Sequence, residues 1–249
     1  MEIIVVDDGS TDASAAVAAS RGAKVIKGAH RGAGAARNAG AAAASGDFLL
    51  LVDADMTFAP HYVSRLIAPL RSGKEIASCH WGEMVANWEN SWARCQTWFF
   101  GNPDRFRQPA KAPEREYVYR AVRRDFFLSS GGFSETEGRT DDSSVSKRTG
   151  VLSVVVPDAG CFHRNPAVPG EIFFDSVWRG KAVVFGVKGQ ALRALYCLLR
   201  NYNPLTLLLR GVLMAARKRE PRLPAFSLLY CAGVWWGVAV SLVDGNYQK

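Results

Sequence analysis

Short apolar runs that end in acidic residues, with alanine-rich segments between them, dominate the first part of this chain. The opening run is β-branched and ends at Asp7 and Asp8. A second run at residues 47–52 ends at Asp53 and Asp55. Strands that alternate with helices favour an α/β fold, with a mostly parallel mixed sheet flanked by helices. Ligands of open α/β sheets bind at the carboxyl ends of the strands, where these four aspartates fall.

The segment between the two acidic ends carries the signals of two helices and one strand. Residues 13–21 and 35–45 are predicted to be helical, and residues 23–26 are predicted to form a short strand between them. Thr11 or Asp12 is expected to cap the first helix, because either side chain can accept an N–H of the first turn. Strands and helices therefore alternate through this part of the chain.

Weaker patterns follow. Residues 60–71 have helical periodicity, and residues 117–122 and 151–156 are predicted strands. The aromatic stretch from residue 81 to residue 98 fits neither period. The five cysteines are widely spaced and form no C-x-x-C pair, so free thiols in a reducing compartment are expected rather than disulfides or a thiolate metal site.

Charge is distributed unevenly along the chain. Residues 1–175 carry 20 Lys and Arg against 21 Asp and Glu, whereas residues 176–222 carry 10 against 1. The net charge of +8 therefore comes from one late segment. A basic segment can bind nucleic acid or an anionic membrane, but no RNA-binding motif of aromatic and basic residues is present, so no nucleic acid is expected.

The C-terminal region, residues 176–249, is predicted to be membrane-associated. Residues 190–200 form a basic amphipathic pattern, and residues 223–243 are uncharged for 21 positions, which is long enough to span a bilayer. The basic cluster Arg217-Lys218-Arg219 lies just before this run and would keep the first domain on the cytoplasmic side. The alternative is that residues 223–243 form a helix buried against the first domain.

Three motifs in the first half closely resemble the nucleotide-binding half of family 2 glycosyltransferases. In order they read Val-Val-Asp-Asp-Gly-Ser-Thr-Asp, Gly-Ala-Gly-Ala-Ala-Arg-Asn-Ala-Gly and Leu-Leu-Leu-Val-Asp-Ala-Asp. The resemblance resumes at Gly-Gly-Phe-Ser-Glu (131–135) and at residues 138–148, and it covers residues 2–166. It implies a GT-A fold with a Rossmann-like nucleotide half in residues 1–175. It also implies inverting transfer of a hexose or related sugar from a nucleotide-diphosphate sugar to an acceptor hydroxyl.

The resemblance assigns expected roles to the aspartates at the strand ends. Asp7 or Asp8 is similar to the residue that binds the nucleotide base, and Arg37 to the basic residue near the base or phosphates. Asp53 would face the donor sugar or ribose or join the metal site. Asp55, at the end of the Asp-x-Asp motif, would hold Mg²⁺ or Mn²⁺, since both ions prefer oxygen ligands.

The second block resembles the part of the family that carries the general base. Asp142 matches the base that takes the proton of the acceptor hydroxyl, and Asp141 is the next candidate. His163 resembles a late histidine that approaches the metal or diphosphate, and Asp158 is an acidic residue near it in sequence. Four tryptophans are expected mainly in the core, with stacking on sugar rings as the alternative: Trp81, Trp88, Trp92 and Trp98.

Departures from the family keep other interpretations open. The family usually has a further strand and helix before the first acidic turn, which predicts an N-terminally truncated domain and, as one alternative, a catalytically impaired binding protein. A dinucleotide-binding oxidoreductase is disfavoured, because Gly32-Ala-Gly34 lacks the third glycine of that fingerprint. No Gln-x-x-Arg-Trp motif follows Asp142, so transfer of single sugars is expected. The acceptor is expected to be a glycan or lipid-linked molecule of the cell envelope, at the cytoplasmic side of the inner membrane.

Overall fold

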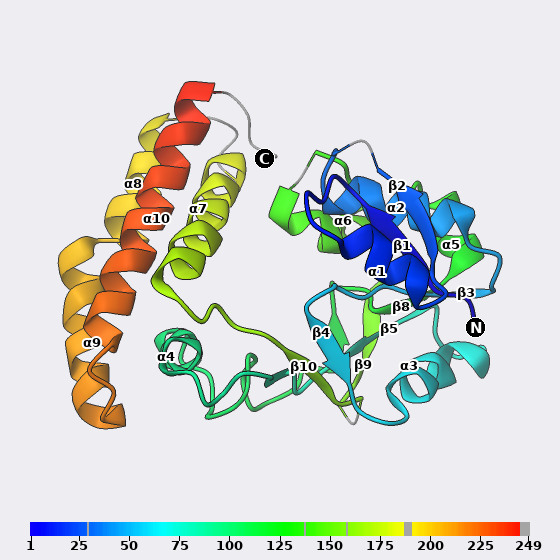
Figure 1. Ribbon diagram of the computed structural model, residues 1–249, viewed down its shortest axis with the longest axis horizontal. Helices are drawn as coiled ribbons and strands as arrows, with labels where there is room; N and C mark the ends of the chain where they lie inside the picture. Colours follow the sequence, from blue (N-terminus) through cyan, green and yellow to red (C-terminus); the bar gives the residue numbers. More distant parts are fainter. Residues whose placement is uncertain (29, 137, 158, 187–190, 245–249) are drawn as a thin grey trace.

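A computed structural model describes residues 1–28, 30–136, 138–157, 159–186 and 191–244. The chain folds into an α/β part and a layer of four long helices, α7 to α10, which stands along one side of it (Figure 1). The chain passes from β10 (Cys161–His163) into the first of these helices, and α4 (Ser91–Phe99) lies against the helical layer (Figure 1).

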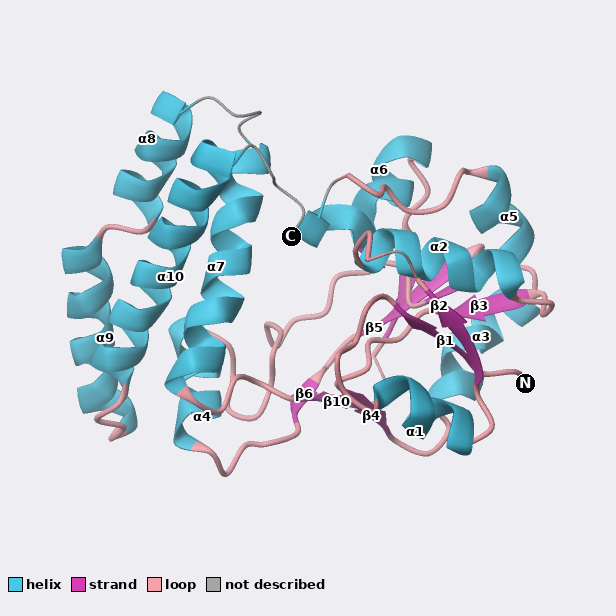
Figure 2. Cartoon of the chain, turned by 45° about the horizontal axis from the view of Figure 1, so that its top comes forward, coloured by secondary structure: helices cyan, strands magenta, loops and turns pink. Residues whose placement is uncertain are grey.

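The first four elements alternate as predicted. In chain order they are β1 (Ile4–Asp7), α1 (Ser14–Ser20), β2 (Lys24–Lys27) and α2 (Ala33–Ala43). The two strands pair in parallel. The predicted cap of α1 by Thr11 or Asp12 is wrong, because Ala13 is the N-cap residue and makes no side-chain capping hydrogen bond; Asp12 Oδ1 instead accepts the Ser14 N–H at 2.9 Å from one position earlier. Helix α2 lies on the same side of the strands as α5 (Arg124–Ser129) and α6 (Ser144–Thr149) (Figure 2).

The largest sheet has five strands in the order β3-β8-β5-β9-β7. Their bounds are β3 (Phe48–Leu50), β8 (Ala121–Arg123), β5 (Ala77–His80), β9 (Ser153–Val156) and β7 (Arg115–Glu116). Strand β8 comes from a distant segment and pairs antiparallel with both β3 and β5. The α/β class and the mixed pairing are confirmed, but three of the four ladders of this sheet are antiparallel and only β5 with β9 is parallel, because β8 and β7 enter it in the opposite direction.

The predicted strand at residues 117–122 is shorter than expected. Only its end forms β8, whereas Tyr119 turns its side chain into the core and donates its hydroxyl to Val151 O at 2.5 Å. The alternation of polar and apolar residues at 117–122 therefore arises from the burial of individual side chains such as Tyr119 and not from one continuous strand. The predicted helix at 60–71 is confirmed as α3 (Tyr62–Arg71), which packs on the five-stranded sheet.

A small three-stranded sheet contains His163, one of the predicted site residues. Its order is β4 (Met56–Phe58), β10 (Cys161–His163) and β6 (Met84–Val85). His163 pairs with Met56 on one side and with Val85 on the other. This register brings His163 beside the residues that precede β4 and β6, namely Asp55 and Glu83.

The long helices form the second part of the molecule. They are α7 (Pro169–Gly186), α8 (Ala191–Asn201), α9 (Pro204–Lys218) and α10 (Leu223–Asp244). Helix α10 packs against α7 and α9 and contacts α4 (Ser91–Phe99). In the described part of the chain, Leu223–Val243 is one helix long and apolar enough to cross a membrane, and half of its most apolar window is buried. The predicted helices at residues 191–200 and 223–243 are confirmed; the prediction for residue 190 lies outside the described residues.

Glycines let α7 and α10 approach until their backbones touch. A Cβ added to Gly233 would lie 2.6 Å from Phe173 O, and one added to Gly237 would overlap Val177 O. Gly180 on α7 faces Val234 O in the same way. The predicted domain boundary after residue 175 therefore falls inside α7, within the stretch where α7 touches α10.

The tryptophan-rich stretch contributes to the core beneath this helical layer. Trp98 is buried in a cluster with Phe99, Phe226 and Tyr230, and Trp88 and Trp92 pack against the same cluster. The core role is thus confirmed for three of the four tryptophans. The cysteines are free, and all but Cys197 are buried.

Candidate functional site

A polar cleft of about 740 Å³ lies between the α/β part and α7. Acidic side chains from both halves of the sequence line it: Asp53, Asp55, Glu83, Asp141, Asp142, Glu171 and Asp175. Five arginines also line it: Arg37, Arg107, Arg120, Arg164 and Arg179. The structure therefore gathers six of the eight predicted site residues in one cleft.

Asp53 is held between two arginines at the end of β3. Its Oδ1 accepts Arg37 Nη2 at 2.7 Å from α2, and its Oδ2 accepts Arg120 Nη1 at 3.0 Å from the segment before β8. Burial alone would raise the pKa of Asp53, but the charges of Arg120 and Arg37 outweigh it and hold the pKa below its usual value. Asp53 is therefore an ionised group whose two oxygens both have cationic partners.

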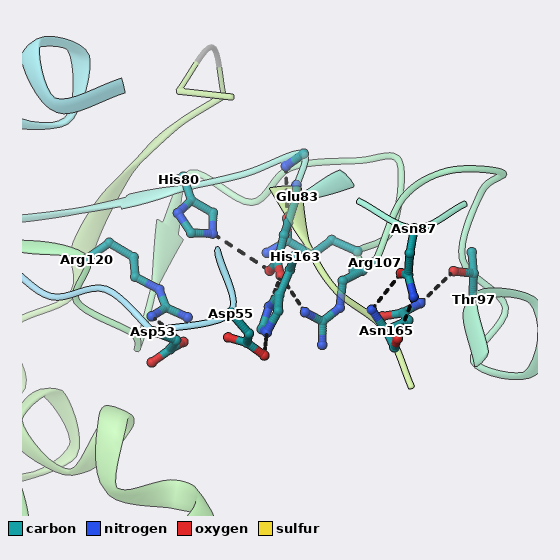
Figure 3. A network of polar contacts seen from close by, with 12 residues as sticks. Asp53, Asp55, His80, Glu83, Asn87, Thr97, Arg107, Arg120, His163 and Asn165 are labelled. Carbon is teal, nitrogen blue, oxygen red and sulfur yellow. Dashed lines mark hydrogen bonds and ion pairs between the residues drawn. The ribbon is translucent and has the colours of Figure 1, made fainter. Parts of the chain in front are cut away.

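Asp55 faces His163 across the mouth of the cleft (Figure 3). Asp55 Oδ2 lies 2.5 Å from His163 Nε2, and the Asp55 side chain is about half exposed. Burial and the nearby charge of Asp53 raise the pKa of Asp55 above its usual value. The predicted pair Asp55 and His163 is thus in contact, although 108 positions separate them in sequence.

Glu83 is a site residue that the sequence did not reveal. Its Oε1 lies 2.5 Å from His163 Nδ1 and accepts Arg107 Nη1 at 2.8 Å, and its Oε2 lies 3.8 Å from His80 Nε2 (Figure 3). Burial raises the pKa of Glu83, but its neighbours His80 and Arg107 more than offset this, so the pKa is lowered. A lone glutamate in an aromatic stretch carries no motif, and only the pairing of β6 with β10 brings it to His163.

The opposite acidic pair comes from a short 3₁₀ helix, η1 (Gly138–Ser143). Asp141 contacts Arg37 Nη1 at 3.2 Å, and only 7% of its side chain is exposed. Burial raises the pKa of Asp141 to about 6, against the lowering effect of Arg37. Asp142 is less buried and also lines the cleft. Arg37 therefore links the Asp53 side of the cleft to the Asp141 side.

Asp7 and Asp8 do not line this cleft. Asp7 ends β1, and its Oδ1 accepts the Ser10 N–H at 2.8 Å; hydrogen bonds from Ser10 lower the pKa of Asp7. Asp8 Oδ2 accepts the Gly32 N–H at 2.7 Å, which ties the first acidic turn to the glycine-rich start of α2. Asp8 thus holds two loops together at the rim of the nucleotide half.

The donor set for a divalent cation is small but chemically suitable. In the parts of the chain that the structure describes, no three candidate ligands surround one point. Asp55 and His163 supply one oxygen and one nitrogen at the cleft mouth, and Mg²⁺ typically takes one or two protein carboxylates together with substrate phosphates. The residues present therefore fit a cation that is bound jointly with a diphosphate. Asp158, predicted near this position, lies outside the described residues.

The far wall of the cleft belongs to α4 and α7. Arg179 stands over the Phe100 ring at 4.9 Å and bonds Asp175 Oδ2 at 2.8 Å. Trp178 lines this wall, whereas the four tryptophans considered for sugar stacking do not. A helix assigned to the C-terminal region thus supplies part of the site.

The mixed α/β fold with an acidic cleft beside its sheet is of the GT-A type. Residues 1–129 match the family model described as glycosyl transferase family 2, which is half of the chain, so the protein belongs to that family. This membership removes the oxidoreductase alternative. No curated protein matches the chain.

Solved glycosyltransferase structures share the fold. A mannosyltransferase from Pyrobaculum calidifontis, PcManGT, in complex with GDP-Man and Mn²⁺, superposes with a TM-score of 0.58 at 16% identity, over 97% of this chain and 77% of that one. S. aureus TarS 1-349 in complex with UDP-GlcNAc superposes with a TM-score of 0.52 at 15% identity, over 100% of this chain and 84% of that one. At these identities the likeness establishes the GT-A fold.

Proposed function

We propose that this protein transfers a sugar from a nucleotide-diphosphate sugar to an acceptor hydroxyl with inversion, using Mg²⁺ or Mn²⁺. The observation that carries the proposal is one cleft with the Asp55–His163 pair on one side and Asp141 and Asp142 on the other. One side suits a metal-bound diphosphate and the other suits proton removal. The fold neighbours bound to GDP-Man with Mn²⁺ and to UDP-GlcNAc support a donor of this class.

Asp55 and His163 would hold the cation on the donor side. A bound divalent cation there would neutralise the diphosphate and make it a better leaving group. Asp53 would approach the donor sugar or ribose, with Arg37 and Arg120 fixing its carboxylate. Asp7 or Asp8, at the end of β1, remains the proposed contact of the nucleotide base.

Asp142 would act as the general base. Its carboxylate would take the proton of the acceptor hydroxyl as that oxygen bonds to the anomeric carbon and the bond to the diphosphate breaks. A single displacement of this kind inverts the anomeric configuration, and no second carboxylate is needed as an acid. Asp142 suits this role better than Asp141, because Asp142 is less buried, whereas only 7% of the Asp141 side chain is exposed.

The reaction can be tested with a panel of nucleotide-diphosphate sugars, Mn²⁺ and candidate glycan or lipid-linked acceptors. We expect acceptor-dependent release of nucleoside diphosphate by the parent chain and a product of inverted anomeric configuration by NMR. Asp55→Ala should abolish Mn²⁺-dependent binding of the nucleoside diphosphate in calorimetry, because it removes a charged ligand. Undiminished binding by that variant would remove Asp55 from the metal site. Donor binding without any turnover would favour the catalytically impaired binding protein.

We also propose that the helical part attaches the protein to the cytoplasmic side of the inner membrane. Helices α8 and α9 carry exposed apolar side chains, with Leu192 83% and Leu205 78% exposed. Residues 191–219 contain six Lys and Arg and no Asp or Glu. Basic and apolar side chains on the same helices suit an anionic lipid surface. A lipid-linked or glycan acceptor would then reach the cleft along α7.

The buried and exposed sides of α10 indicate how the helical part would contact the membrane. One side of α10 forms the core with α7 and α9, and Leu228 and Trp236 are exposed on its other side. This arrangement supports attachment through the helical layer as a unit, with α10 anchored in its packing. Flotation of the protein with vesicles of anionic lipid, at low and at high salt, tests this attachment.

A further inference from the structure

The Glu83 carboxylate is mounted on a fixed piece of main chain. Glu83 lies in the turn between β5 and β6, where its N–H donates to Gln108 Oε1 at 3.0 Å and its carbonyl accepts the Arg107 N–H at 2.9 Å. The residue is only 8% exposed. The position of its side chain is therefore set by the surrounding fold, whether or not a ligand is bound.

The partners of this carboxylate determine what it can do. Arg107 donates a hydrogen bond to Oε1 of Glu83, and the His80 ring lies near Oε2. The buried Glu83 carboxylate therefore has a cationic neighbour and a polar neighbour, which favour its ionised form. An ionised carboxylate only accepts hydrogen bonds. The hydrogen of the short contact between Glu83 and His163 is therefore carried by Nδ1 of the histidine.

The other ring nitrogen, Nε2, points to Asp55 at the mouth of the cleft, where Asp55 Oδ2 lies 2.5 Å from it (Figure 3). Without a cation this short contact also holds a hydrogen between the two atoms, whereas a cation bound there would take the electron pair of Nε2 in place of that hydrogen. Histidines that ligate metals typically donate their second ring N–H to a carboxylate or carbonyl, which fixes the tautomer and the ring orientation. The Glu83–His163–Asp55 arrangement has this form.

We propose that Glu83 is a positioning residue that holds His163 in its Nδ1–H tautomer and directs Nε2 beside Asp55 toward a divalent cation. The proposal rests on the metal-dependent function above, and it adds a residue that does not itself contact the cation. Loss of such a partner typically costs about 10-fold to 100-fold in metal affinity.

The test needs a change at Glu83 that keeps its size and a control of equal burial. Glu83→Gln keeps the shape but offers an amide that can either donate or accept. Glu220→Gln is the matched control, because Glu220 is 5% exposed, pairs with Arg94 at 3.0 Å and lies outside the cleft lining. Glu83→Asp retains the charge on a shorter side chain and serves if Glu83→Gln does not fold.

Two measurements are made on the full chain without donor. In the first, ¹⁵N-histidine NMR at saturating Mg²⁺, with His163 assigned through His163→Asn, should show a hydrogen on Nδ1 and none on Nε2 in the parent and in Glu220→Gln. It should show a mixture of tautomers in Glu83→Gln. In the second, titration with Mn²⁺ alone, followed by the electron paramagnetic resonance signal of the free ion, should give about 10-fold to 100-fold weaker binding for Glu83→Gln. Glu83→Asp should fall between the parent and Glu83→Gln.

The outcomes separate this proposal from the proposed function. An unchanged His163 tautomer in Glu83→Gln would overturn the positioning role, even if Mn²⁺ binding fell. Unchanged Mn²⁺ affinity in a variant of a parent that binds Mn²⁺ would also overturn it. A parent that binds neither Mn²⁺ nor Mg²⁺ would contradict the metal dependence, and the loss or retention of the hydrogen-bonded Nδ1–H signal in Glu83→Gln would then decide whether Glu83 orients His163.

Discussion

The cleft and the helical layer are held together by different physical means. In the cleft, short strands and loops present charged side chains, and many of these are held by opposite charges, as Asp53 is by Arg37 and Arg120. In the helical layer, α7 and α10 touch through glycines, and apolar side chains form the core. Substitutions in the cleft should therefore change binding and turnover with little loss of stability. Substitutions between the helices should change stability first.

The largest effect on stability is expected where the two helical backbones meet. Gly237→Leu should lower the free energy of unfolding by about 3 kcal/mol, because a side chain there overlaps Val177 O on α7. Gly170→Leu, at an open position of the same helix pair, is the control. Thermal unfolding of both variants in detergent would measure the difference. Equal stability of the two variants would mean that α7 and α10 do not pack as closely as described.

The largest effect on turnover is expected at the proposed base. Asp142→Asn should lower sugar transfer by at least about 10²-fold while donor binding and thermal stability stay close to the parent, because an amide keeps the shape but cannot accept the proton. Asp125→Asn, with a carboxylate 70% exposed on α5, is the control. Turnover and donor titration would be measured side by side. Comparable turnover in Asp142→Asn would make Asp141 the candidate base.

A smaller effect should distinguish the outer face of the helical layer from its core. Removing two charges, with Arg193→Gln and Arg217→Gln, should weaken binding to vesicles of anionic lipid by about 30-fold, at about 1 kcal/mol per charge. Folding should be preserved, because both residues are exposed. Vesicle flotation at low and high salt would measure it, with neutral vesicles as the control. A parent that stays soluble with anionic vesicles would contradict the membrane proposal.

The smallest effect concerns Asp141, a cleft carboxyl of which only 7% of the side chain is exposed. Burial raises the pKa of Asp141 to about 6, above its unfolded value, so Asp141 contributes stability that is full below the unfolded pKa and is lost as the pH rises through about 6. From about pH 7 to about pH 5 the parent should gain about 1 kcal/mol of unfolding free energy relative to Asp141→Asn. Urea unfolding of both proteins would measure this. A pH-independent difference between them would show that Arg37 keeps Asp141 ionised throughout.

Local pattern predicted those features that depend on neighbours in sequence. The elements α1, β2, α2 and α3 follow from hydrophobic period and from the turn residues between them, which act over a few neighbouring positions. The acidic ends of β1 and β3 also follow from sequence, and with them the candidates Asp53 and Asp55. The family resemblance then added Asp142 and His163 as candidates, and the structure gathers these two in the cleft with Asp53 and Asp55.

Contacts between distant segments could not be predicted from the sequence. Strand β8 enters the sheet antiparallel because it fits between β3 and β5, and no local pattern encodes that neighbour. The same limit hid Arg120, which reaches Asp53 from the segment before β8, and Trp178, which reaches the cleft from α7.

By itself, the sequence determined the α/β class, the acidic strand ends and an apolar helix of bilayer length, because periodicity, turn chemistry and hydropathy act locally. Only the tertiary structure decided that Glu83 meets His163 and that half of α10 is buried against its neighbours. The pairing of β10 with β6 sets the first contact across 80 positions of sequence. The close glycine packing of α7 on α10 sets the second, since hydropathy measures the length of an apolar run and not what covers it.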